Sequence, residues 1–105
     1  MLIGLLLILA LPVAAQRKVK FGIFDKATDQ PIIGAVITYA DNEKLKSPQR
    51  VVTNMDGEAT ISVPQSDKCY YQVVSVGYNP LKGTIGSDSS LKLFMTEDVM
   101  KVNEV

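Results

Sequence analysis

The chain has 105 residues, with 11 basic and 11 acidic side chains, no histidine and a single cysteine. This balance of charge removes the electrostatic basis for a nucleic-acid or anionic-membrane partner, so we expect neither. The lone Cys69 cannot form an internal disulfide, and we expect it to be a small buried residue in a strand.

The N-terminal stretch MLIGLLLILALPVAA is apolar and ends in small residues. Val13 and Ala15 fit the −3 and −1 positions of a secretory cleavage site, so we predict a signal peptide over residues 1–15 and a mature chain from Gln16. The run is shorter than the roughly 18–20 apolar residues that span a bilayer. A retained membrane anchor is the alternative. No Lys or Arg precedes the apolar segment, which indicates a weak signal or a start further upstream.

From Arg17 onward the sequence shows strand signals and no convincing helix. Apolar and polar residues alternate with a period of two, or β-branched residues cluster, between segments rich in turn-forming residues. We predict strands at 18–24, 32–40, 51–53, 58–63, 69–76, 81–85 and 91–95. The apolar run 69–76 predicts a central strand covered on both faces, and 81–85 an edge strand. Gly34, near the start of a strand, suggests a bulge or a close backbone approach.

About seven short strands in one small domain predict an all-β fold, an antiparallel sandwich of the immunoglobulin-like kind. Each alternating strand has one apolar face to cover, and with no helix available a second sheet is the remaining cover. We place this single domain at residues 16–98.

The stretch VTNMDGEATISV gathers several acidic and amide side chains around one glycine, as calcium-binding loops do. An EF-hand loop needs oxygen ligands at positions one, three and five, a glycine at six and a glutamate at twelve. With Gly57 at position six, Val52 falls at one and Val63 at twelve, and neither side chain can bind a metal. We therefore predict no metal site here.

A turn explains the same stretch better. Asp56 and Gly57 stand between two β-rich runs, which predicts a hairpin with a type I′ turn. We expect the side chain of Asn54 to tighten this turn by a hydrogen bond to the backbone.

Catalytic residues are not evident. Without histidine, no Ser–His or Cys–His pair is possible, and chemistry by carboxylates alone needs two acids in one cleft. The acidic residues fall almost entirely in predicted turns or on polar strand faces, where acids are normally solvated. We therefore predict no catalytic or cofactor-binding residue, no cofactor, and a chain that is not an enzyme.

Four stretches in order resemble the carboxypeptidase-regulatory-like domain: FGIFDKATDQPIIGAVI, TNMDGEATISVP, VVSVGY and VNEV. The residues that carry the resemblance are Gly34 after a proline, the Asp56–Gly57 pair, and Gly77–Tyr78 at the end of a buried strand. The resemblance implies a transthyretin-like sandwich. For Tyr78 we expect a ring packed over the sheet with its hydroxyl at the surface, or else a contact with a partner.

With a signal peptide in front, the arrangement resembles the N-terminal extension of SusC/RagA-type TonB-dependent outer-membrane receptors of Bacteroidetes, which import glycans or peptides. The resemblance implies a non-catalytic accessory domain, exported to the periplasmic side of the outer membrane and present here as a fragment or truncated copy. Residues 99–105 would begin a linker toward a plug domain. The implied partners are the receptor's plug and barrel or periplasmic energy-coupling proteins, with no small-molecule substrate. An accessory domain of an exported enzyme and a surface adhesin module are the alternatives.

Overall fold

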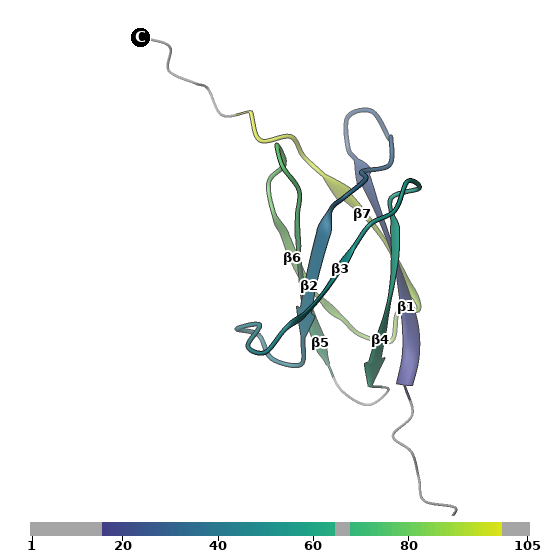
Figure 1. The fold of residues 1–105 in the computed structure, drawn as a ribbon, viewed down its shortest axis with the longest axis vertical. Coiled ribbons are helices and arrows are strands. Elements are labelled where there is room, and N and C mark those ends of the chain that lie inside the picture. The colour runs from purple at the N-terminus through teal and green to yellow at the C-terminus, as the bar shows by residue number, and fades with distance from the viewer. Residues whose placement is uncertain (1–15, 65–67, 100–105) are drawn as a thin grey trace, which may run out of the picture.

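The computed structural model describes residues 16–64 and 68–99. The predicted signal peptide at 1–15 lies outside the described residues, as does the predicted linker at 99–105 except for Val99. Within the described ranges the fold is all-β, with seven strands in two sheets (Figure 1). The predicted fold class is therefore confirmed. In the part of the chain that the structure describes, no helix could cross a membrane.

The strands follow the predicted alternation closely. In chain order they are β1 (Gln16–Asp25), β2 (Val36–Ala40), β3 (Gln49–Val52), β4 (Glu58–Pro64), β5 (Cys69–Val74), β6 (Leu81–Ile85) and β7 (Ser90–Met95). β1 and β4 bury every second residue, the period expected when one face of a strand meets a core.

The two sheets have the strand orders β4-β1-β7 and β3-β2-β5-β6. All neighbouring pairs are antiparallel except β1 and β7, which run parallel. The purely antiparallel arrangement that we predicted is therefore wrong for this one pair. Alternation reports which face of a strand is buried but carries no information on its direction. A parallel pair needs a long connection, which β2 to β6 supply here.

The core lies between the sheets and consists mainly of branched aliphatic side chains. Phe21 and Tyr71, one from each sheet, meet edge to face with ring centroids 5.3 Å apart. The largest side chains with almost no exposed surface are Phe21, Ile23, Ile37, Ile85, Met95, Val19, Val63 and Val73.

Two predicted strands differ from the structure. The segment 32–40 is a strand only from Val36, because a turn at Ile33–Gly34 precedes it. The segment 69–76 ends as a strand at Val74 and is buried on one face only. An apolar run does not distinguish a strand covered on both faces from one whose outer valines remain exposed, and Val74 is 45% exposed.

Candidate interaction site

Three connecting segments meet at one end of the sandwich, the upper end in Figure 1. We call this end, formed by residues 25–35, 53–57 and 75–79, the turn end. Backbone hydrogen bonds join two of its segments and tie one of them to β1: Gly34 N donates to Thr53 O at 3.1 Å, and Ile23 N donates to Gly57 O at 2.8 Å. The residues that carried the family resemblance all lie here: Gly34, Asp56, Gly57, Gly77 and Tyr78.

Asp25 and Tyr78 link two of these segments through their side chains. The Tyr78 hydroxyl donates to Asp25 Oδ2 at 2.6 Å, and the backbone N–H groups of Ala27 and Thr28 donate to Asp25 Oδ1 at 2.8 and 3.1 Å. Asp25 is only 6% exposed, so a carboxylate at the end of β1 is held by three donors instead of by water. The Tyr78 side chain is partly buried, and its hydroxyl makes an intramolecular hydrogen bond that the sequence did not predict.

These hydrogen bonds change the acidity of both groups. Donation by Tyr78, followed by donation from Thr28, lowers the pKa of Asp25 from its ordinary value of 3.8, against the opposing effect of desolvation. The same hydrogen bond raises the pKa of Tyr78 from its ordinary value of 10.0. At any pH between the two pKa values, Asp25 is a carboxylate and Tyr78 a neutral phenol, so the hydrogen bond between them persists as a structural link.

Thr53 is the second buried polar group of the turn end. Its hydroxyl donates to Ile32 O at 2.7 Å and accepts from Ala35 N at 2.8 Å. Its own N–H donates to Ala35 O at 2.9 Å, and its side chain is 4% exposed. One threonine therefore satisfies both ends of the Ile32–Ala35 turn, whose backbone groups would otherwise be buried without partners.

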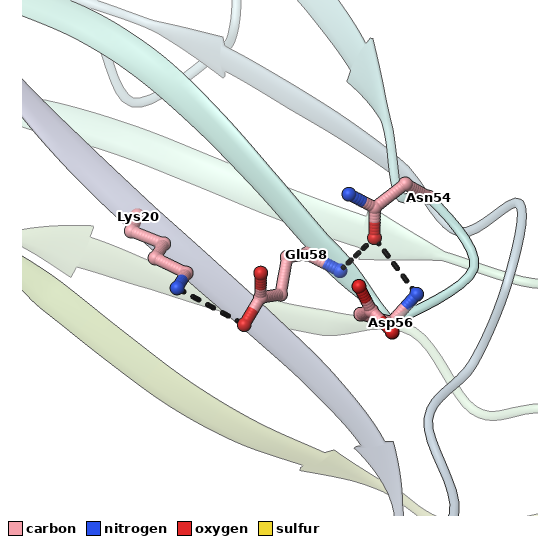
Figure 2. A network of polar contacts seen from close by, with 4 residues as sticks. All are labelled: Lys20, Asn54, Asp56 and Glu58. Atoms are coloured by element: carbon pink, nitrogen blue, oxygen red, sulfur yellow. Dashed lines mark hydrogen bonds and ion pairs between the residues drawn. The ribbon is translucent and has the colours of Figure 1, made fainter.

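The acidic stretch around Gly57 is a compact turn. Asn54 Oδ1 accepts from the N–H groups of Asp56 and Glu58 at 2.9 and 3.0 Å, and Gly57 N donates to Asn54 O at 2.9 Å. The tightening role predicted for Asn54 is thus present (Figure 2). Glu58 also meets Lys20 at 3.0 Å, a largely exposed ion pair that contributes little to stability.

The hairpin prediction for this stretch is wrong. The flanking strands β3 and β4 belong to different sheets, so the turn is a corner between sheets. Gly57 has a φ of 74°, but Asp56 is not among the residues with positive φ, as a type I′ turn requires. Asp-Gly chemistry specifies a change of direction. Whether the flanking strands pair is decided by their other neighbours, β2 and β1.

Two glycines of the turn end are needed for different reasons. A Cβ on Gly57 would stand 2.6 Å from the carbonyl oxygen of Ile23 and 3.0 Å from Pro31 Cβ, in addition to its positive φ. Gly34 has a φ of 80° but open space around its Cβ position. The bulge or close approach suggested for Gly34 is therefore not found, and the close approach occurs at Gly57.

Apolar side chains project from this rigid frame. Ile33 is 62% exposed, Met55 78% and Val76 99%. Ile33 and Val76 line an open groove of about 400 Å³, together with Asp25, Thr28, Gln30, Pro31, Ile32, Gly34, Ser75 and Tyr78.

The apolar surface continues onto the outer face of the four-stranded sheet. Val36 pairs with Val52 on one side and with Val74 on the other, so the three side chains lie in one row. Val52 is 56% exposed and Val74 45%. The row adjoins the two turns that carry Ile33 and Val76, since β2 begins and β5 ends there.

Sequence reasoning missed Asp25 and Thr53 as residues of this site, although for Asp25 a signal was present. Asp25 has the same parity as Val19, Phe21 and Ile23, so the alternation of β1 already directs its side chain inward. Grouping it with solvated acids was wrong. Its partner Tyr78 is 53 residues away, and only the fold brings the two together.

Other side chains that could carry chemistry are dispersed. Cys69 is 4% exposed, as predicted, and burial is the largest cause that raises the pKa of its thiol. Among the residues that the structure describes, no group of three or more Cys, Asp or Glu side chains converges on a possible metal position.

The fold is shared with domains of larger proteins. Hydroxyquinol 1,2-dioxygenase from Pseudomonas putida DLL-E4 superposes with a TM-score of 0.61 at 13% identity, over 85% of this chain and 59% of its own. Catechol 1,2-dioxygenase from Pseudomonas arvilla C-1 gives 0.65 at 10% identity, over 91% and 57%. A streptococcal ancillary pilin gives 0.60 at 18% identity, over 80% and 30%. The chain thus spans from under a third to under two thirds of these structures. No protein-family model and no curated protein matches the sequence.

These comparisons correct the prediction that the chain is not an enzyme. An intradiol ring-cleavage dioxygenase from Tetranychus urticae also superposes on this chain. Together with the two dioxygenases above, it shows that the fold is one that enzymes use. We had excluded catalysis because histidine is missing and the acids are scattered. Those features restrict which reactions a chain can perform, but they do not establish that its fold serves no enzyme. At these low identities the likeness shows the fold alone.

Proposed function

We propose that this chain is an interaction module of a larger exported protein, and that the turn end is its docking face. The observation that carries the proposal is the exposure of Ile33, Met55 and Val76 on loops that internal hydrogen bonds hold in place. Exposed apolar side chains on a fixed backbone favour association, because little conformational entropy is lost when a partner covers them.

The exit of the chain supports the same face. Asp98 N donates to Gly77 O at 2.9 Å, and Tyr78 pairs with Glu97 in an isolated bridge. Asp98, near the end of the described residues, therefore lies beside Gly77, the neighbour of Val76 in the turn end. A segment that follows would meet the apolar face with little search, which raises its effective concentration there.

The partner is proposed from the sequence resemblance. We assign the module to the periplasmic side of a SusC/RagA-type TonB-dependent receptor, where it would contact the plug and barrel or an energy-coupling protein. The four motifs in order and the apolar N-terminal stretch support this assignment. A second candidate is a sandwich module of a larger enzyme or surface protein, which the dioxygenase and pilin superpositions favour.

The test has a genetic and a physical part. The coding sequence downstream of codon 105 is determined, and the chain is expressed with and without the segment that it encodes. We expect a plug and barrel, and we expect amide exchange at Ile33 and Val76 to slow by about ten-fold or more when that segment is present. The variant Ile33→Ser/Val76→Ser removes the slowing, whereas Phe94→Ser, an exposed apolar residue outside the turn end, retains it.

The outcomes separate the parts of the proposal. A downstream sequence that encodes neither plug nor barrel ends the receptor assignment. Unchanged exchange in the longer chain removes the docking face. Export is tested by the mass of the chain recovered from the cell envelope, which we expect to begin at Gln16.

A further inference from the structure

A second surface lies between the edges of the two sheets and meets the turn end only at Lys26 and Asn79. An open groove of about 640 Å³ runs between β6 and β7. Its lining combines apolar, aromatic and basic side chains and contains no acid: Lys26, Tyr71, Leu81, Lys82, Lys92, Leu93, Phe94 and Thr96. In a chain with equal numbers of acidic and basic residues, three lysines without an acid are a local excess of positive charge.

We propose that this groove binds an extended acidic peptide, which adds to the free edge of β7 as a further strand. The peptide would alternate acidic and apolar residues. Its acidic side chains face Lys92 and Lys26, and its apolar side chains face Leu93 and Leu81. The proposal does not depend on the function proposed for the turn end.

Backbone geometry identifies which groups of β7 are open. Lys20 N donates to Ser89 O at 3.0 Å, and Lys26 N donates to Met95 O at 2.9 Å, so the odd-numbered carbonyls point to β1. Directions alternate along a strand, and in a parallel pair alternate residues bond to the same neighbour. The N–H and C=O groups of Lys92 therefore point to the opposite side, where the described part of the chain places no strand.

The molecule itself uses this edge at one point. Thr96 O, which continues the even-numbered series, accepts from Asn79 N at 2.9 Å. A backbone donor from outside the sheet thus already pairs with this side of the strand at its C-terminal end. Lys92 and Phe94 come directly before it, and they give a short length of edge that a peptide could extend.

The side chains around this edge are arranged for an anionic strand. Lys92 Nζ lies 5.0 Å from the ring centroid of Phe24 and 5.5 Å from that of Phe94, so the two rings hold the ammonium group over the outer face of β1 and β7, beside the free edge. Phe94 is 39% exposed, while Leu81 and Leu93 are partly buried against the core. Charge at the rim and apolar surface at the base match a strand of alternating acidic and apolar residues.

Lysines on an edge strand also have a simpler use, which is to prevent pairing with other chains. The two roles predict different behaviour toward an acidic peptide. Lysines that only prevent strand pairing repel basic strands and bind no peptide, whereas a docking site binds an acidic strand at defined backbone groups.

The experiment uses protein expressed from the full 105-residue sequence and a fluorescein-labelled peptide of alternating Glu and Val. We expect saturable binding by fluorescence anisotropy, weakened by salt, with amide chemical-shift changes that centre on Lys92 and Phe94. The variant Lys26→Glu/Lys92→Glu should raise the Kd by about ten-fold or more.

A matched variant controls for net charge. Lys46→Glu/Lys68→Glu makes the same change of charge in another groove, and its Kd should stay near that of the parent chain. Equal loss of binding in both variants would mean unspecific attraction and overturn the proposal. It would also be overturned by no binding of the parent chain, in which case the lysines serve only to prevent strand pairing, or by shift changes that leave Lys92 and Phe94 unaffected.

Discussion

Replacing Thr53 with valine tests whether one buried hydroxyl holds the turn end together. The substitution keeps the size and branching of the side chain but removes the hydroxyl. The hydroxyl donates a hydrogen bond to Ile32 O at 2.7 Å and accepts one from Ala35 N at 2.8 Å. Each buried backbone group left without a partner costs about 1–3 kcal/mol. We therefore expect Thr53→Val to lower the free energy of unfolding by about 2–6 kcal/mol, a large part of the stability of a small domain.

The assay is urea unfolding followed by far-UV circular dichroism, with the m-value fitted for each variant. Thr53→Ser keeps the hydroxyl and should lose only about 0.8 kcal/mol for the missing methyl group. Thr60→Val, at an exposed position on β4, should stay within about 0.5 kcal/mol of the parent chain. A Thr53→Val protein as stable as Thr60→Val, with an unchanged m-value, would refute the assignment of these two hydrogen bonds as the support of the turn.

Three further predictions concern other parts of the molecule. Gly57→Ala should cost more stability than Gly34→Ala in the same urea assay, because both have positive φ but a Cβ only at Gly57 meets backbone 2.6 Å away; equal losses would contradict this. Tyr78→Phe should raise the pKa of Asp25 and reduce stability at neutral pH. The lowered pKa of Asp25 stabilises the fold above about pH 3.8, and this contribution is lost as the pH falls through the pKa of the folded state. The free energies of unfolding of the parent and the variant should therefore converge in acid. A constant difference between them down to that pH range would exclude the hydrogen bond between Tyr78 and Asp25 as the cause. Cys69 should react with a thiol reagent only after unfolding, and labelling of the native protein at the rate of a free thiol would show that it is accessible.

The alternation of residues predicted the strands well because burial of one face is a local property of the sequence. β1, β4 and β7 fall where the pattern places them, and β6 is the edge strand that was expected. The direction of β7 was not predictable in this way, since a strand buries the same residues whether its neighbour runs parallel or antiparallel.

The candidate site was predicted only in part. Gly34, Gly57 and Tyr78 were identified as motif residues, but Asp25 and Thr53, which hold them together, were not. A turn residue can be recognised from local chemistry, whereas a hydrogen bond such as that from Tyr78 to Asp25 joins segments 53 residues apart. The same limit explains the incorrect hairpin, because the pairing of β4 with β1 depends on a strand far earlier in the chain.

The parallel pairing of β1 with β7 also constrains when the protein can fold. β1 precedes the other described strands in the chain and is the central strand of its sheet, yet Lys20 pairs with Ser90, about 70 residues later. Closing so long a loop costs conformational entropy before the stabilising contacts between the two strands form, and such topologies fold slowly. One side of the nascent central strand therefore stays unpaired until β7 has been synthesised. A ribosome that stalls before Ser90 would display that unpaired strand as a site for chaperones or for aggregation.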